Sequence, residues 1–87
     1  MSKIFTIYEN AQLIECPDRW IYYKEIESAP LILMESEQKH PGELFFNFCG
    51  LRSSFIKELN TEQKTLQSDI IVNIVTKNNK YAFKVRV

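Results

Sequence analysis

The chain has 87 residues, of which 45% are hydrophobic, 13% aromatic and 25% charged, and its eleven basic residues balance its eleven acidic ones. Because this length suits one domain and this composition is too apolar for a disordered segment, we expect a single compact domain over residues 1–87. Zero net charge argues against an acidic mimic of nucleic acid. It also argues against a protein that coats nucleic acid with its whole surface.

The cysteine content and the lengths of the apolar runs indicate the cellular compartment. Small secreted domains usually carry four or more cysteines, whereas this chain has Cys16 and Cys49 alone. The N-terminus lacks the apolar run of a signal peptide, and no stretch approaches the roughly 20 apolar residues that span a bilayer. We therefore expect free thiols, no membrane contact and a cytoplasmic location, which is the host cytoplasm if a phage encodes the chain.

The first predicted strand covers residues 3–8. Residues 20–26 are rich in aromatic and β-branched side chains and predict a second strand, although a helix that begins at Pro17 is the alternative. Residues 31–34 continue the apolar pattern, 40–42 indicate a turn, and 43–49 read as a buried strand. Residues 54–67 predict the main helix, because Phe55, Ile56 and Leu59 fall on one stripe at helical spacing.

The C-terminus carries the clearest pattern, two β-branched or alternating runs at 69–76 and 81–87. Asn78-Asn79 between them predicts a two-residue type I′ turn, since asparagine tolerates positive φ. That turn would pair Thr76 with Tyr81 and give the hairpin one apolar face. The opposite face would then be basic and carry Lys77, Lys80, Lys84 and Arg86. The predicted fold class is α+β: a small, mostly antiparallel sheet of about five strands with one main helix, ending in this hairpin.

Catalytic equipment is sparse. His40 is the one histidine, and pairing it with Cys16 or Cys49 as a nucleophilic couple has no local support. The same three residues match none of the common zinc spacings. Gly42 and Gly50 are the only glycines, which excludes a glycine-rich phosphate loop. We therefore predict no catalytic residue, no metal site and no cofactor.

One arrangement of charged residues resembles the PD-(D/E)xK nuclease family. Asp18 precedes a predicted strand, and Glu37 and Lys39 follow the apolar run that ends at residue 34. The resemblance implies that Asp18 and Glu37 bind Mg²⁺ and that Lys39 positions the attacking water. The chain departs from the family at Gln38, usually an apolar position, and at Pro30, which interrupts the hairpin. A minimal Mg²⁺-dependent nuclease is the third functional interpretation.

Aromatic and basic side chains supply the candidate binding residues. Trp20, Tyr22 and Tyr23 cannot all be buried by a strand with one solvent face, and exposed Trp and Tyr are common interface anchors. They can also stack on single-stranded bases. The charge is divided, with a net of −4 over residues 1–48 and +4 over residues 49–87. Four cations on one hairpin face make a small footprint for nucleic acid.

From these patterns we predict a small non-catalytic protein-binding protein, an inhibitor or adaptor that blocks a larger partner sterically through Trp20, Tyr22 and Tyr23. Its composition suits a phage or mobile-element protein that acts against a host defence or nucleic-acid-processing system. The alternative is a nucleic-acid-binding domain that uses the basic hairpin face together with these aromatic residues. The sequence leaves the oligomeric state open.

Overall fold

The computed structural model of the chain describes residues 2–37 and 41–86. Seven strands and one 3₁₀ helix follow one another along the chain. They are β1 (Ser2–Glu15), η1 (Asp18–Glu25), β2 (Ala29–Ser36), β3 (Leu44–Phe48), β4 (Leu51–Arg52), β5 (Ile56–Glu62), β6 (Ile70–Thr76) and β7 (Lys80–Val85).

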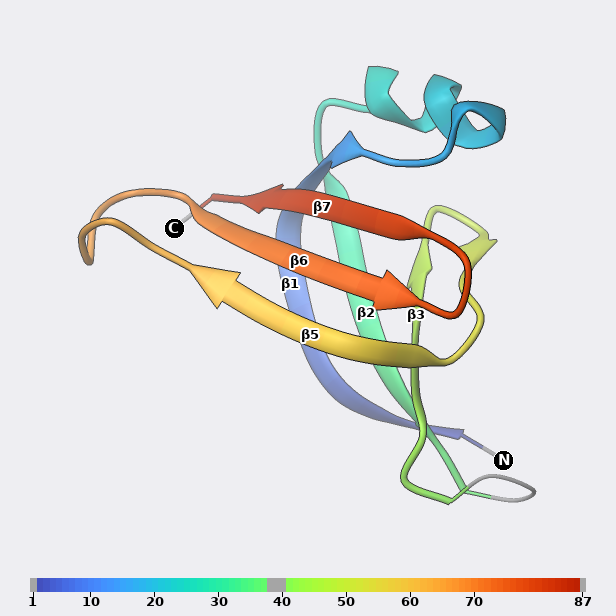
Figure 1. Cartoon of the computed structure of the whole chain (residues 1–87). Helices are drawn as coiled ribbons and strands as arrows, with labels where there is room; N and C mark the ends of the chain where they lie inside the picture. The colour runs from blue at the N-terminus through green and yellow to red at the C-terminus, as the bar shows by residue number, and fades with distance from the viewer. Residues whose placement is uncertain (1, 38–40, 87) are drawn as a thin grey trace.

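All seven strands belong to one antiparallel sheet in the order β4-β3-β2-β1-β7-β6-β5. Two meanders, β1 to β4 and β5 to β7, are joined where β7 pairs with β1. In Figure 1 the strands β5, β6 and β7 cross in front of β1, β2 and β3, so the sheet folds over itself into two layers. β3 and β5 also come into contact, which brings the two layers together away from β1.

β1 is long and bent, and it takes part in both layers. Its N-terminal part pairs with β2, and from Ala11 onward it pairs with β7. Register shifts interrupt its pairing with β2 between Ile4 and Thr6 and again between Tyr8 and Ala11. Such bulges bend a strand and increase its twist. They allow one continuous strand to leave the first layer and enter the second.

The core lies between the layers and is built around aromatic rings. Phe46 of β3 lies edge-on to two rings of β7, at 4.9 Å from Tyr81 and 5.2 Å from Phe83 between ring centroids. Phe48 contacts Phe83 in the same way at 5.1 Å. Fully buried aliphatic side chains complete this core: Leu13, Leu31, Leu33, Val72 and Ile74. Full burial of a side chain of this size stabilises a fold by about 1.5–3 kcal/mol.

The predicted α+β class with a main helix and about five strands is wrong, because the described chain is a seven-stranded sheet with one short 3₁₀ helix. Residues 54–67 form no α-helix. Instead β5 pairs with β6, with Leu59 opposite Ile74. The helical spacing of apolar residues had no surface to pack against, and Leu66 ends 88% exposed in the loop after β5. Pairing with the apolar edge of β6 outweighed local helical preference.

The strand predicted at 20–26 is also wrong, because these residues lie in η1. Pro17 occupies the N-cap of η1, and the Trp20 N–H donates to the Pro17 carbonyl at 2.9 Å. The helical alternative was therefore nearer to the structure. The strands predicted at 3–8 and 43–49 are confirmed, the first as part of β1 and the second with β3 at its centre, and the apolar residues 31–34 lie within β2.

The C-terminal hairpin and its core face are confirmed, but its register is wrong. Ile74 pairs with Tyr81, and Val75 pairs with Lys80. The Thr76 N–H donates to the Asn79 carbonyl at 2.9 Å, so the loop sits one residue earlier than predicted. Neither loop residue has positive φ, and the turn is not of type I′. Each residue of β6 therefore pairs with a residue of β7 that lies two positions earlier than predicted. Because side chains alternate with a period of two, this shift leaves every side chain on its predicted face.

Candidate functional site

η1 lies outside the two layers, beyond the strands at one end of the molecule (Figure 1). Trp20, Tyr23 and Ile26 are partly buried and pack against the core. Ile21 and Tyr22 point away from it and are 55% and 57% exposed. η1 thus packs on the sheet through every third side chain and presents large apolar side chains to solvent.

The rings of η1 support one another. Tyr22 stacks on Tyr23 with a centroid separation of 4.7 Å, and Trp20 meets Tyr23 edge-on at 6.1 Å. The Arg19 guanidinium lies 5.4 Å from the centre of the Trp20 ring, within the range of a cation–π contact. Desolvation, followed by a hydrogen bond with Tyr22, raises the pKa of Tyr23 above its usual value. The structure therefore brings the three aromatic residues singled out in the sequence into one preorganised cluster.

The two cysteines differ in exposure. Cys16 follows β1 and is partly buried, and this burial raises the pKa of its thiol, opposed in part by Lys24. Cys49 is exposed in the tight turn between β3 and β4, with a φ of +52° next to Gly50 at +87°. Both are free thiols, as predicted. His40, their hypothetical catalytic partner, lies outside the described residues.

The four predicted basic residues do not form one uniform patch. Lys80 and Lys84 lie on the outward face of β7, whereas Lys77 belongs to the turn before it and Arg86 follows its end. The Lys84 ammonium is 3.5 Å from the carboxylate of Asp69. One of the four charges is thus already paired.

Acidic side chains of β5 lie on the same outward face as the lysines of β7. Val75 of β6 pairs with Glu58 on one side and with Lys80 on the other. Further along β6, the same arrangement places Glu62 and Lys84 on either side of one residue. Sequence reasoning missed this balance because it assigned these glutamates to a helix. The resulting face is of mixed sign.

The nuclease-like residues are not brought together. Asp18 begins η1, whereas Glu37 follows the far end of β2, a strand whose eight residues span roughly 25 Å. Figure 1 places η1 and the C-terminal end of β2 at opposite ends of the molecule. Lys39 lies outside the described residues. Within residues 2–37 and 41–86, no group of three or more His, Cys, Asp or Glu side chains is arranged to hold a metal ion.

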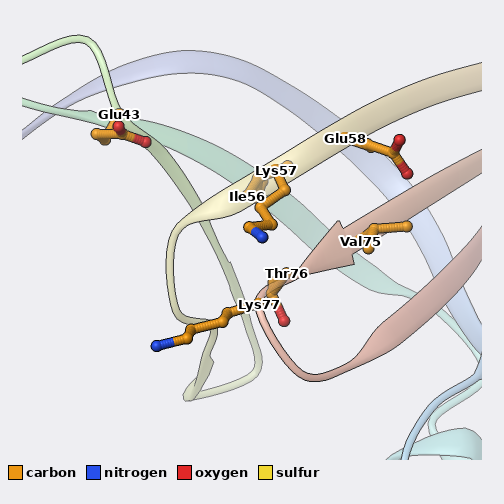
Figure 2. Close-up of a pocket in the computed structure, with 7 residues that line it drawn as sticks. All are labelled: Glu43, Ile56, Lys57, Glu58, Val75, Thr76 and Lys77. Carbon is orange, nitrogen blue, oxygen red and sulfur yellow. The ribbon is translucent and has the colours of Figure 1, made fainter.

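A shallow hollow of about 680 Å³ lies between β5, the end of β6 and the segment before β3. Its lining includes Lys57, Lys77, Glu43 and Glu58. Figure 2 shows these four side chains spread around the hollow without converging on one point, and Lys77 extends away from it. Opposite charges that do not converge give no clear recognition of either an anion or a cation.

Exposed apolar residues of β1 form a second surface. The sequence analysis placed these residues in a strand but did not identify them as candidate binding residues. Ile4, Phe5 and Ile7 are 56%, 55% and 46% exposed. The sequence did indicate their exposure, because residues 4, 5, 7 and 8 are all apolar and a strand with one face in solvent cannot bury them all.

Comparison with known proteins finds no matching protein family, no matching curated protein and no matching solved structure. Among the described residues, no helix has the length and apolar character needed to cross a membrane.

Proposed function

We propose that this chain is a small protein-binding protein that docks onto a larger protein through η1. The observation that carries the proposal is the exposure of Ile21 and Tyr22, 55% and 57%, on a segment whose neighbouring side chains are partly buried and pack against the core. Large apolar and aromatic side chains of this kind supply most of the binding energy at protein interfaces.

The ring cluster makes η1 a favourable docking element. Tyr22 is stacked on Tyr23, so it loses little conformational freedom when a partner covers it. Arg19 beside Trp20 adds a side chain that can donate hydrogen bonds at the rim of the interface.

The chemistry of the partner follows from the charge distribution. η1 itself carries two acidic and two basic residues, Asp18, Glu25, Arg19 and Lys24, and has no net charge. A partner with an apolar pocket for Tyr22 and a rim of both charge signs would therefore be complementary in charge. Steric blocking needs only a rigid surface of about 800 Å² per partner, which a chain of this size can supply. An inhibitor or adaptor, encoded by a phage or mobile element and directed at a host system, is the role that suits these properties.

Nucleic-acid binding through the hairpin is less favoured. Lys84 is paired with Asp69, and Glu58 shares the outward face of the sheet with Lys80. Phosphate contacts require unpaired cations in sufficient number.

The test is affinity capture from a lysate of the source cell with the wild-type chain, Tyr22→Ser and Leu66→Ser, each with and without nuclease. Leu66→Ser is the matched control, because it also removes an exposed apolar side chain, but from the loop after β5. We expect the wild type and Leu66→Ser to recover the same protein with and without nuclease, and Tyr22→Ser to recover about tenfold less. Circular dichroism verifies that each variant is folded. Equal recovery by Tyr22→Ser, or loss of the partner after nuclease treatment, would contradict the proposal.

A further inference from the structure

One edge of β1 carries no neighbouring strand. β7 ends beside Ala11, where Val85 pairs with it, and the Arg86 N–H donates to the Asn10 carbonyl at 2.9 Å. Before that point β1 pairs on one side only, with β2, and no other strand of the described chain lies beside it (Figure 1). The unpaired backbone groups of such an edge are a template for another strand.

The other two edges of the sheet are protected. β4 is only two residues long, and a strand this short offers little backbone for pairing. β5 exposes charged side chains along its length, among them Lys57, Glu58 and Glu62. Charges of this kind discourage pairing with another sheet. The edge of β1 instead exposes large apolar side chains.

The first bulge of β1 places two of these side chains on one face. Ile4 pairs with Met34 and Ile7 pairs with Ile32. Positions 32 and 34 share a face of β2, opposite to the buried Leu33. Ile4 and Ile7 therefore point together to the outside of the molecule, where with Ile32 and Met34 they form an apolar strip along the free edge.

We propose that a second copy of this chain pairs with the β1 edge in antiparallel fashion, about a two-fold axis between Phe5 and Thr6. In this register Ile4 of each copy lies opposite Ile7 of the other, and both residues are on the outward face. Lys3 of each copy lies opposite Tyr8. The two sheets become continuous, and the apolar strips of both copies merge across the junction. Self-pairing must match faces, and the bulge at Phe5 allows this register to do so while Ile4 and Ile7 lie opposite each other.

The charges of the edge favour the same arrangement. Lys3 lies near one end of the free segment and Glu9 near the other, so antiparallel pairing brings the basic end of each copy beside the acidic end of its partner, with the two side chains on opposite faces of the sheet. Parallel pairing would align like charges, which is unfavourable. Lys3 is only loosely bound within the chain, at 3.9 Å from Glu35 and 4.0 Å from Glu37. Glu9 has no ion-pair partner within residues 2–37 and 41–86. The charges of the edge thus disfavour parallel pairing and favour the antiparallel arrangement.

The test uses Ile4→Lys and Ile7→Glu, studied separately and mixed, with molar mass measured by sedimentation and light scattering. The wild type should form a species of about twice the 10.3 kDa chain mass. Each single variant places a charge opposite an isoleucine at both ends of the pairing and should weaken self-association by about tenfold. The mixture should restore dimer, because a lysine at position 4 of one chain then lies opposite a glutamate at position 7 of the other, while Ile7 and Ile4 lie opposite each other at the other end.

Two controls make the result decisive. Lys57→Glu reverses a charge on the β5 edge and should leave self-association unchanged, as should Tyr22→Ser, which tests the separate surface on η1. Hydrogen exchange of the wild-type chain should show amides of residues 4–8 exchanging more slowly as concentration rises, a readout that needs no variant. A wild type that stays monomeric, single variants that dimerise as well as the wild type, or a folded mixture that does not would overturn the proposal.

Discussion

Phe46 packs between the two layers, because it is fully buried on β3 and contacts rings of β7 at 4.9 and 5.2 Å. Replacing such a residue by alanine costs about 3–5 kcal/mol, of which each edge-to-face contact accounts for about 1 kcal/mol. A domain of 87 residues has a total stability of roughly 4–13 kcal/mol. Phe46→Ala should therefore remove a large fraction of the free energy of unfolding, and Phe46→Leu, which keeps most of the volume, about 1.5 kcal/mol.

Urea denaturation followed by circular dichroism measures both losses. The matched control is Asn47→Ala on the next residue of β3, which lies on the opposite face and is only partly buried, and which should cost less than about 0.5 kcal/mol. The denaturant slope should be unchanged, since the surface exposed on unfolding stays nearly the same. If Phe46→Ala cost no more than Asn47→Ala, the two-layer arrangement around this ring would be refuted.

Three further predictions concern single side chains. Cys49 has a φ of +52°, a conformation that costs a non-glycine residue about 1–2 kcal/mol, so Cys49→Gly should stabilise the protein in chemical denaturation; equal or lower stability would contradict this. A thiol reagent should modify exposed Cys49 before Cys16, whose burial raises its thiol pKa, and equal rates would speak against the difference in environment. Burial also raises the pKa of Tyr81, so its contribution to stability is present below a pH of about 10 and is lost as pH rises through the folded-state pKa; Tyr81→Phe should show a weaker loss in alkaline denaturation, and an identical pH profile would count against it.

The period-2 pattern of the C-terminal residues identified the hairpin and its buried face correctly. Val72, Ile74 and Phe83 alternate with polar or less buried neighbours, and this alternation depends only on which face meets the core. The turn was misplaced because the loop geometry does not use the positive φ that asparagine tolerates. An alternating pattern of side chains therefore predicts the buried face of a strand more reliably than it predicts which residues pair across the hairpin.

The helix predicted at 54–67 failed for a tertiary reason. β6 pairs with β7 along one edge, and β5 forms the backbone hydrogen bonds along its other edge. In this pairing Ile56 lies opposite Thr76 and Leu59 lies opposite Ile74. The last residues of the predicted helix lie in a turn after β5, in which the Thr65 N–H donates to the Ser68 hydroxyl at 2.9 Å. Local motifs for caps and for turns use the same residue types, so they did not distinguish the two outcomes.

The candidate aromatic site was recognised from residue type, although its setting was not. Trp20, Tyr22 and Tyr23 were assigned to a strand, because aromatic residues are frequent in strands. In the structure Trp20 and Tyr23 pack against the core from outside the sheet, and Tyr22 stacks on Tyr23. Ile21 was overlooked, since an isolated aliphatic residue has no exposure signal in sequence.

The central claim, that η1 docks onto a protein partner, is tested most directly by calorimetric titration of the purified captured partner with the wild-type chain, Tyr22→Ala and Leu66→Ala. We expect Tyr22→Ala to raise the dissociation constant by about thirtyfold, equivalent to about 2 kcal/mol, with Leu66→Ala unchanged. A dissociation constant for folded Tyr22→Ala equal to that of the wild type would contradict the claim.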